Sequence, residues 1–216
     1  MNREDPSVLK TDSGVVDDRD RNLEDFLSLR VRLSARSLGK LQQCCSAVEF
    51  AAGRLVFGIG ADAWLGFFLR SGVIRVWTPA QDGKNNESTR QFFRSGFIAS
   101  PYSEFMKNAQ VAANFSAVSA ISGWTVDLRQ LRELAEQDSE LLAILNLIAN
   151  DYIESLQQRV DVATRLDASS RLNWFYQNHR ELIGVAPQSV LASYVGLTRE
   201  TVNRLRPKQT DQKVVG

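Results

Sequence analysis

The stretch VGLTRETVNRLRP, residues 195–207, combines the apolar spacing of a buried helix with three arginines and one glutamate. It follows PQSVLASY, residues 187–194, and the two stretches together predict two short helices joined by a tight turn. Gly196 stands where this turn needs an unusual backbone angle, and Thr198 stands where a hydroxyl caps the second helix. With small and apolar residues at the inner positions, this pattern is typical of a DNA-binding helix-turn-helix.

The outer face of the second predicted helix carries polar side chains that can contact DNA. Arginine pairs bidentately with O6 and N7 of guanine, and glutamate accepts from N4 of cytosine. The candidate base-reading residues are Arg199, Glu200 and Arg204. Candidate phosphate or auxiliary contacts are Thr198, Asn203, Arg206 and Ser189. The alternative is an exposed Glu200–Arg204 ion pair, which is worth only about 0.3–0.5 kcal/mol and leaves the glycine and threonine framework unexplained.

The rest of the chain divides by its hydrophobic spacing. Residues 1–22 are polar and aperiodic, which predicts a disordered tail. Residues 23–127 open with a predicted helix to about residue 45 and continue as short apolar bursts separated by glycines, which predict an antiparallel sandwich or roll. Residues 128–166 predict a short helix and one long helix beginning at Asp138, and residues 167–216 predict the helix-turn-helix domain. The expected fold class is therefore α+β.

The long predicted helix carries an apolar stripe over close to thirty residues. A helix of this length favours packing against the same helix of a second subunit in a two-fold pair. The side chains predicted to form this dimer contact are Leu141, Leu145, Ile148, Tyr152 and Leu156. The alternative is a spine that packs only within its own chain.

Composition excludes several classes of function. Cys44 and Cys45 are adjacent and His179 is the single histidine, so we expect no metal and no iron–sulfur cluster; His179 is expected at the surface or between domains. No nucleophile–histidine pattern or phosphate-binding loop is present, and we expect no enzyme. The chain has no apolar run near the roughly 18 residues of a membrane span and no signal peptide, so we expect a cytoplasmic protein without a membrane partner.

Charge is unevenly distributed along the chain. From Arg165 onward there are eight Lys and Arg residues against four Asp and Glu residues, whereas the rest of the chain is mildly acidic. A basic C-terminal region indicates an anionic partner such as nucleic acid.

Over residues 23–208 the chain resembles the Crp–Fnr family of bacterial transcription regulators. The resemblance rests on AAGRLVFGIG (51–60) and LGFFLRSGVIRVW (65–77) in the roll, and on VGLTRETVNRLR (195–206) in the recognition helix. It implies a cyclic-nucleotide-binding-type β-roll of the double-stranded β-helix or jelly-roll type, a long dimerisation helix and a C-terminal helix-turn-helix. Arg199, Glu200 and Arg204 match the family's base-reading positions, which implies recognition of TGTGA-like half-sites. The resemblance also implies that a homodimer binds a palindrome of two such half-sites in double-stranded DNA. RNA polymerase and an unknown small-molecule effector are further candidate partners.

The sequence departs from the family in its ligand cassette and at its C-terminus. Members that bind cyclic AMP carry a glutamate for the ribose and an arginine for the phosphate. In the matching stretch, residues 95–121, Ser100 replaces the glutamate, Asn114 or a neighbour falls at the arginine position, and Lys107 is the single cation. We expect no binding of cyclic AMP in the usual way, and the cofactor is unknown. Ten residues follow Arg206, so no C-terminal wing is expected.

The sequence therefore predicts a dimeric, sequence-specific DNA-binding transcription regulator. The alternative is a ligand-sensing β-roll module whose C-terminal helices mediate protein contacts rather than DNA binding.

Overall fold

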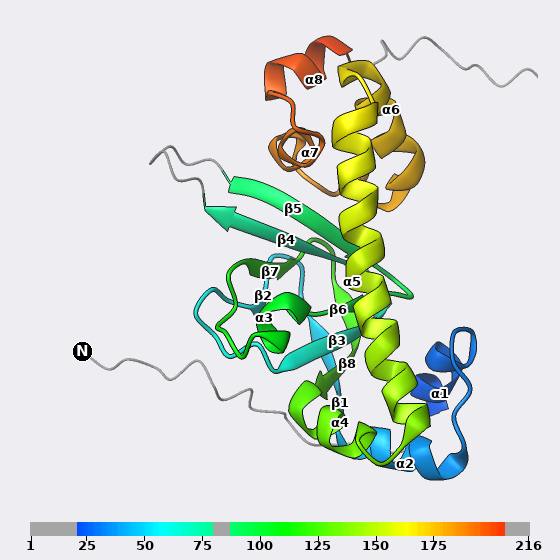
Figure 1. Ribbon diagram of the computed structural model, residues 1–216. Coiled ribbons are helices and arrows are strands. Elements are labelled where there is room, and N and C mark those ends of the chain that lie inside the picture. Colours follow the sequence, from blue (N-terminus) through cyan, green and yellow to red (C-terminus); the bar gives the residue numbers. More distant parts are fainter. Residues whose placement is uncertain (1–20, 80–86, 206–216) are drawn as a thin grey trace, which may run out of the picture.

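The computed structural model describes residues 21–79 and 87–205 of the 216-residue chain. The predicted tail falls almost entirely outside these ranges, and Arg206 and the segment after it also lie outside the described residues. Within them, a β-rich body is flanked by one long helix that leads to a cluster of short helices at the far end (Figure 1).

Two four-stranded antiparallel sheets form the body, in the orders β1-β8-β3-β6 and β2-β7-β4-β5. The first sheet consists of β1 (Cys45–Phe50), β8 (Ile121–Asp127), β3 (Leu65–Ser71) and β6 (Ile98–Ala99). The second sheet consists of β2 (Leu55–Phe57), β7 (Asn114–Ala117), β4 (Val73–Pro79) and β5 (Glu87–Arg94). Both sheets bury apolar residues in one shared core. The antiparallel roll that was predicted from short apolar segments separated by glycines is confirmed.

The turn between β3 and β4 requires a glycine. Gly72 has φ +84°, and a Cβ atom there would lie 2.3 Å from the carbonyl oxygen of Ala120. A side chain would therefore meet both backbone strain and a direct clash with fixed backbone.

The helices follow local capping signals. Their bounds are α1 (Arg21–Ser28), α2 (Ala35–Gln43), α3 (Tyr102–Met106), α4 (Leu128–Ala135), α5 (Ser139–Arg165), α6 (Ala168–Asn178), α7 (Gln188–Val195) and α8 (Arg199–Leu205), with a 3₁₀ turn at Arg180–Leu182. Asp138 caps α5 by accepting from the Glu140 amide, and Asp167 caps α6 by accepting from the Ser170 amide. The long helix and its starting residue are as predicted.

The single helix predicted from residue 23 to about residue 45 is wrong. The chain forms α1 and α2 instead, because Ser34 adopts an extended backbone and caps a new helix by accepting from the Ser37 amide. Cys44 ends α2, and Cys45 begins β1. Helix α3 was not predicted at all, since five residues are too few for a helical period to show.

One face of α5 packs against its own roll. Leu141, Ile144 and Ile148 are completely buried in the core that the two sheets share. Leu141 and Ile148 were predicted as dimer contacts, and this is wrong because a side chain with no exposed surface in its own chain cannot cover a second chain. Leu145 also packs against the core but keeps some exposed surface.

A second stripe of α5, beside the buried one, is apolar and exposed, and its Leu156 also lines a cavity between α5 and the roll. Leu142, Ile153, Leu156 and Val160 are between 42% and 58% exposed in the isolated chain. Of the predicted dimer residues, Leu156 lies in this set, and the ring of Tyr152 lies 6.0 Å from that of Tyr102 on α3. Helix α5 thus packs on its own chain along one stripe, and a neighbouring apolar stripe is exposed in the single chain.

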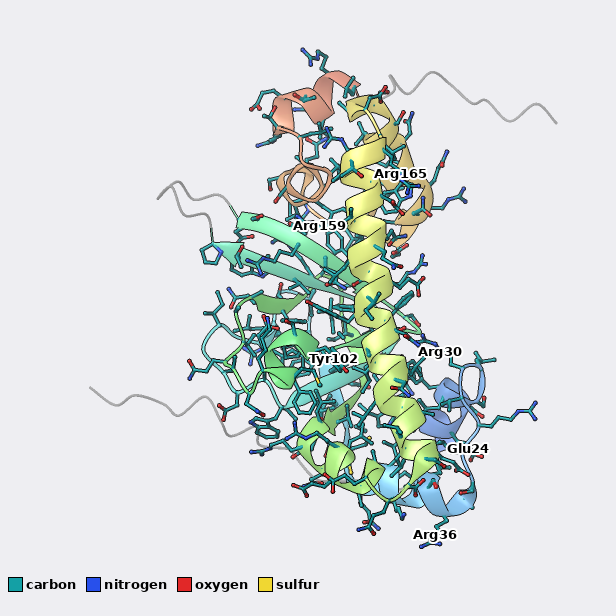
Figure 2. The ribbon with its side chains drawn as sticks, viewed as in Figure 1. Glu24, Arg30, Arg36, Tyr102, Arg159 and Arg165 are labelled. Carbon is teal, nitrogen blue, oxygen red and sulfur yellow. The ribbon has the colours of Figure 1, made fainter. Side chains whose placement is uncertain are left out.

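A partly buried ion pair and a backbone hydrogen bond fix α5 to the segment after α1 and to β6. Asp151 is completely buried and accepts hydrogen bonds from Arg30 at 2.7 Å and from the Ile98 amide at 2.9 Å, with a second bond from the other terminal nitrogen of Arg30. Arg30 lies beside α5 after the end of α1 (Figure 2). The hydrogen bond to Asp151 raises the pKa of Arg30, so the cation persists at any physiological pH.

No helix within residues 21–79 and 87–205 has both the length and the apolar composition needed to cross a membrane.

Candidate nucleic-acid interface and ligand cavity

The turn between α7 and α8 has the predicted geometry. Gly196 ends α7 in the left-handed conformation with φ +68°, and the Leu197 amide donates to the carbonyl of Ala192 at 2.9 Å. The Thr198 hydroxyl accepts from the Thr201 amide at 3.1 Å and so caps α8. Both local roles assigned from the sequence are confirmed.

The inner faces of α7 and α8 pack on α6. Their buried residues are Val190, Leu191, Ala192, Val195 and Val202, which share a core with Leu172, Phe175 and Leu182. This packing leaves one orientation for α8, with its polar residues outward.

The outer face of α8 is fully available to a partner. Arg199, Glu200, Asn203 and Arg204 are exposed, as is Ser189 near the start of α7. Glu200 and Arg204 form no ion pair, so the exposed-pair alternative has no support in the structure. Hydrogen bonds from its own amide and from the Thr198 hydroxyl lower the pKa of Glu200. Glu200 is therefore an ionised acceptor at neutral pH, and its contact with a base stays a prediction.

The helix-turn-helix is docked on the roll through α7 and β5, a contact the sequence did not predict (Figure 1). The Ser193 hydroxyl accepts from the Thr89 amide at 2.7 Å and donates to the Glu87 carbonyl at 2.8 Å. The Thr89 hydroxyl donates to the Val190 carbonyl at 3.3 Å. These bonds set the position of α7, and hence of α8, relative to the roll.

Aromatic rings fill the same junction. Phe92 of β5 lies 4.9 Å from Tyr194 and 5.8 Å from His179, measured between ring centroids. His179 is 5% exposed, and its Nδ1 lies 3.6 Å from a carboxylate oxygen of Glu181. Burial lowers the pKa of His179. Of the two positions expected for this histidine, the structure selects the one between domains.

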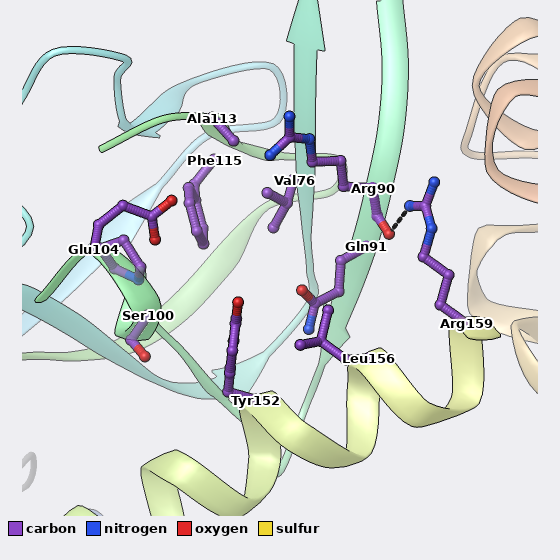
Figure 3. A pocket seen from close by; sticks show the side chains of 11 residues that line it. Val76, Arg90, Gln91, Ser100, Glu104, Ala113, Phe115, Tyr152, Leu156 and Arg159 are labelled. Atoms are coloured by element: carbon purple, nitrogen blue, oxygen red, sulfur yellow. Dashed lines mark hydrogen bonds between the residues drawn. The ribbon is translucent and has the colours of Figure 1, made fainter. Parts of the chain in front are cut away.

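A cavity of about 320 Å³ lies between the roll and α5 (Figure 3). Its lining comes from β4, β5, β7, α3 with its preceding residues, and α5. The lining residues are Val76, Arg90, Gln91, Ser100, Pro101, Glu104, Ala113, Phe115, Tyr152, Leu156 and Arg159. Its size lies at the lower end of the roughly 300–1,000 Å³ range of small-molecule sites.

The structure brings one of the three predicted cassette residues to this cavity. Ser100 lines it and is 2% exposed. Asn114 instead accepts from the Ile59 amide at 3.1 Å, and Lys107 is exposed at the end of α3; neither lines the cavity. Of the three residues of the degenerate cassette, Asn114 and Lys107 therefore lie away from this cavity, because strand register and the end of α3 place them elsewhere.

Sequence reasoning missed most of the polar lining. Gln91, Glu104, Tyr152 and Arg159 are brought together from β5, α3 and α5. Only Glu104 lies in the stretch that the family resemblance pointed to, and no spacing rule links it to the others. In the described ranges, no group of three or more His, Cys, Asp or Glu residues is placed to hold a metal ion.

Comparisons with solved structures give the fold its class. A putative Crp/Fnr transcriptional regulator from Eubacterium rectale is similar with TM-score 0.64 at 12% identity, over 84% of this chain and 86% of that one. FixK2 from Bradyrhizobium japonicum is similar with TM-score 0.61 at 16% identity, over 74% and 82%. The c-di-GMP-responsive regulator CLP from Xanthomonas campestris is similar with TM-score 0.60 at 15% identity, over 80% and 89%. The chain has the fold of Crp–Fnr transcription regulators.

No family model and no curated protein sequence matches the chain. Because the identities to the solved structures are low, the likeness establishes the architecture, and the function has to be argued from this chain's own residues.

Proposed function

We propose that the protein is a dimeric, sequence-specific DNA-binding transcription regulator and not an enzyme. The observation that carries this is the outer face of α8. Arg199, Glu200 and Arg204 are all exposed there, on a helix held by the Gly196 turn and the Thr198 cap. Such side chains at the start and middle of a recognition helix lie where base edges are read in the major groove.

The proposed dimer forms through the exposed face of α5. Ile153, Leu156 and Val160 follow each other at helical spacings of three and four residues and are exposed in the single chain. A two-fold pair of α5 helices would bury this face and set two α8 helices against half-sites about 34–36 Å apart. Palindromic DNA with G·C-containing half-sites is the proposed target, and RNA polymerase and a small effector are proposed partners in the cytoplasm.

The test begins with selection of preferred DNA from a random library by the full chain. Arg199→Ala and Arg204→Ala are each expected to weaken binding to the selected palindrome by about 1–3 kcal/mol, measured by fluorescence anisotropy at physiological salt. Arg180→Ala is the matched control, because Arg180 is exposed in the same domain but lies outside α8. It removes the same charge and is expected to change binding little.

The decisive readout is specificity. If Arg204 reads a base, its loss relaxes preference at one position of each half-site and leaves binding to random DNA nearly unchanged. Equal losses on selected and random DNA would assign the two arginines to phosphates instead. Failure of the selection to enrich any sequence would favour the alternative in which the C-terminal helices contact a protein.

A further inference from the structure

Two buried polar groups in the cavity of the roll have no hydrogen-bond partner. They are the hydroxyl of Ser100, a residue that is 2% exposed, and the amide nitrogen of Gln91. Buried polar groups are paired in the great majority of proteins, because an unpaired one loses its bonds to water without replacement. Figure 3 shows the Gln91 side chain reaching into the space between β5 and α3, which also contains Ser100. Both groups therefore point to a polar ligand.

A β-bulge supplies the positive charge at this site. Val76 of β4 pairs with Gln91 and Trp77 pairs with Thr89, so Arg90 is an extra residue on β5. Its guanidinium lies above Val76, on the same side of β5 as the Gln91 side chain (Figure 3). Arg90 forms no ion pair with any carboxylate of the described ranges.

Arg159 of α5 holds the bulge in place from the other side of β5. It donates to the carbonyl of Thr89 at 2.9 Å and also to the carbonyl of Arg90. It too has no carboxylate partner among the described residues. Burial lowers the pKa of Arg159, Tyr194 partly offsets this by raising it, and the charge of Arg90 contributes a smaller lowering. An anion near the bulge would offset two neighbouring positive charges.

The opposite end of the cavity is different. Glu104 of α3 lies across from β5 and presents a carboxylate, which is an acceptor for a hydroxyl donor (Figure 3). Phe115 and Leu156 form apolar walls between the two ends, and the Tyr152 ring lies beside them. A matching ligand has an anionic end, an apolar middle and a hydrogen-bond donor at its far end.

We propose that this cavity binds a small hydroxylated aromatic carboxylic acid. Its carboxylate lies between the guanidinium of Arg90 and the amide of Gln91. Its ring packs between Phe115 and Leu156, and its hydroxyl, at the α3 end, donates to Glu104 and accepts from the Ser100 hydroxyl. The cations come from β5 and α5 and not from residues 95–121, so the ligand is held differently from a nucleotide in the cassette that the resemblance implied.

The charges of the cavity favour one orientation of an anionic ligand. A cationic ligand would lie close to the Arg90 guanidinium, whereas an anionic group on the β5 side would pair with it; Arg90 is exposed, so water hydrates its charge when the cavity is empty. A dianion filling the whole cavity would meet the Glu104 carboxylate at its far end. A molecule that is polar at both ends, with the anion on the β5 side, matches both walls.

Isothermal titration calorimetry on the full chain tests the proposal. The probes are 4-hydroxybenzoate, 4-hydroxyphenylacetate and 3-(4-hydroxyphenyl)propanoate, each with its primary amide as a neutral control of nearly equal size. At least one acid is expected to bind, and its amide is expected to bind at least about tenfold more weakly, since charge-assisted hydrogen bonds are the stronger ones. Binding of none of the acids, or equal binding of acid and amide, would overturn the proposal.

Matched variants locate the ligand within the cavity. Arg90→Gln is expected to weaken the acid about tenfold or more and to leave its amide unchanged. Glu104→Gln is expected to weaken the hydroxylated acid more than the same acid without its hydroxyl. Arg54→Gln, at an exposed arginine of the roll outside the cavity, is the control and should change neither. Acid binding that survives Arg90→Gln unchanged would place the ligand elsewhere. No DNA enters these measurements, so their failure is separate from a failure of the proposed DNA binding.

Discussion

Asp151 provides a direct test of how α5 is attached to the roll. Its carboxylate is completely buried, and Asp151→Ala removes the bonds from Arg30 and from the Ile98 amide. Ile98 is 1% exposed, so its unpaired N–H costs about 1–3 kcal/mol. The Arg30 side chain is 27% exposed and regains some water, so its contribution is smaller. We expect the free energy of unfolding to fall by about 3 kcal/mol, at the low end of the range for breaking buried pairs.

The assay is urea unfolding followed by tryptophan fluorescence and circular dichroism. Asp161→Ala is the matched control, because Asp161 lies on the same helix and pairs with Arg165 at 3.1 Å, with side chains 55% and 77% exposed. An exposed i,i+4 pair contributes about 0.3–0.5 kcal/mol, so the control should barely change the midpoint. A loss below about 1 kcal/mol for Asp151→Ala, or one equal to that of the control, would refute the argument that burial makes this pair important.

Three further predictions concern the domain junction and the cavity. Burial lowers the pKa of His179 below its ordinary value of 6.5, so below pH 6.5 the unfolded chain binds more protons than the folded one. The free energy of unfolding is therefore constant above pH 6.5 as far as this group is concerned. It falls as the pH drops below 6.5, by at most about 1.4 kcal/mol per pH unit. His179→Gln should remove that slope in unfolding curves between pH 7.5 and 5, and an unchanged slope would contradict the assignment. Ser193→Ala should lower the free energy of unfolding by about 1 kcal/mol, because it removes two hydrogen bonds to β5. Ser189→Ala is the control, since Ser189 is exposed on the same helix and its loss should have little effect. Equal effects of the two variants in chemical denaturation would show that the junction bonds contribute little to stability. Cyclic AMP should give no micromolar binding by calorimetry, and a micromolar dissociation constant would show that the roll holds the nucleotide without the missing arginine.

Much of the fold could be predicted because its determinants are local. Asp138 and Asp167 begin helices by accepting from amides two or three residues away, and Thr198 does the same for α8. Gly196 ends α7 because a left-handed backbone angle suits a residue without a side chain. Alternation and glycine turns likewise showed the strands of the roll, and the polar face of α8 followed from helical spacing alone.

The wrong predictions at residues 23–45 and along α5 have separate physical causes, one local and one tertiary. The helical spacing of apolar residues correctly indicated helices in both places. It does not indicate where a capping serine begins a new helix, or which apolar stripe of a helix faces the core. Leu141 and Ile148 turned into the roll because α4, β6 and α2 cover that face of α5 in the folded chain. The sequence showed that α5 carries an apolar stripe, but it did not show which part of the protein covers that stripe.

What the sequence by itself determined is therefore the strands of the roll, the long helix with its cap, the turn between α7 and α8 and the residues on the outer face of α8, since all of these depend on neighbours within a few positions. Tertiary structure alone decided the pairing of Arg30 with Asp151 across 121 residues and the union of Gln91, Glu104 and Tyr152 around one cavity. It also decided the docking of α7 on β5. The cavity lining depends on strand register and on a one-residue bulge at Arg90, because a shift of a single residue in a strand sends every later side chain to the other face.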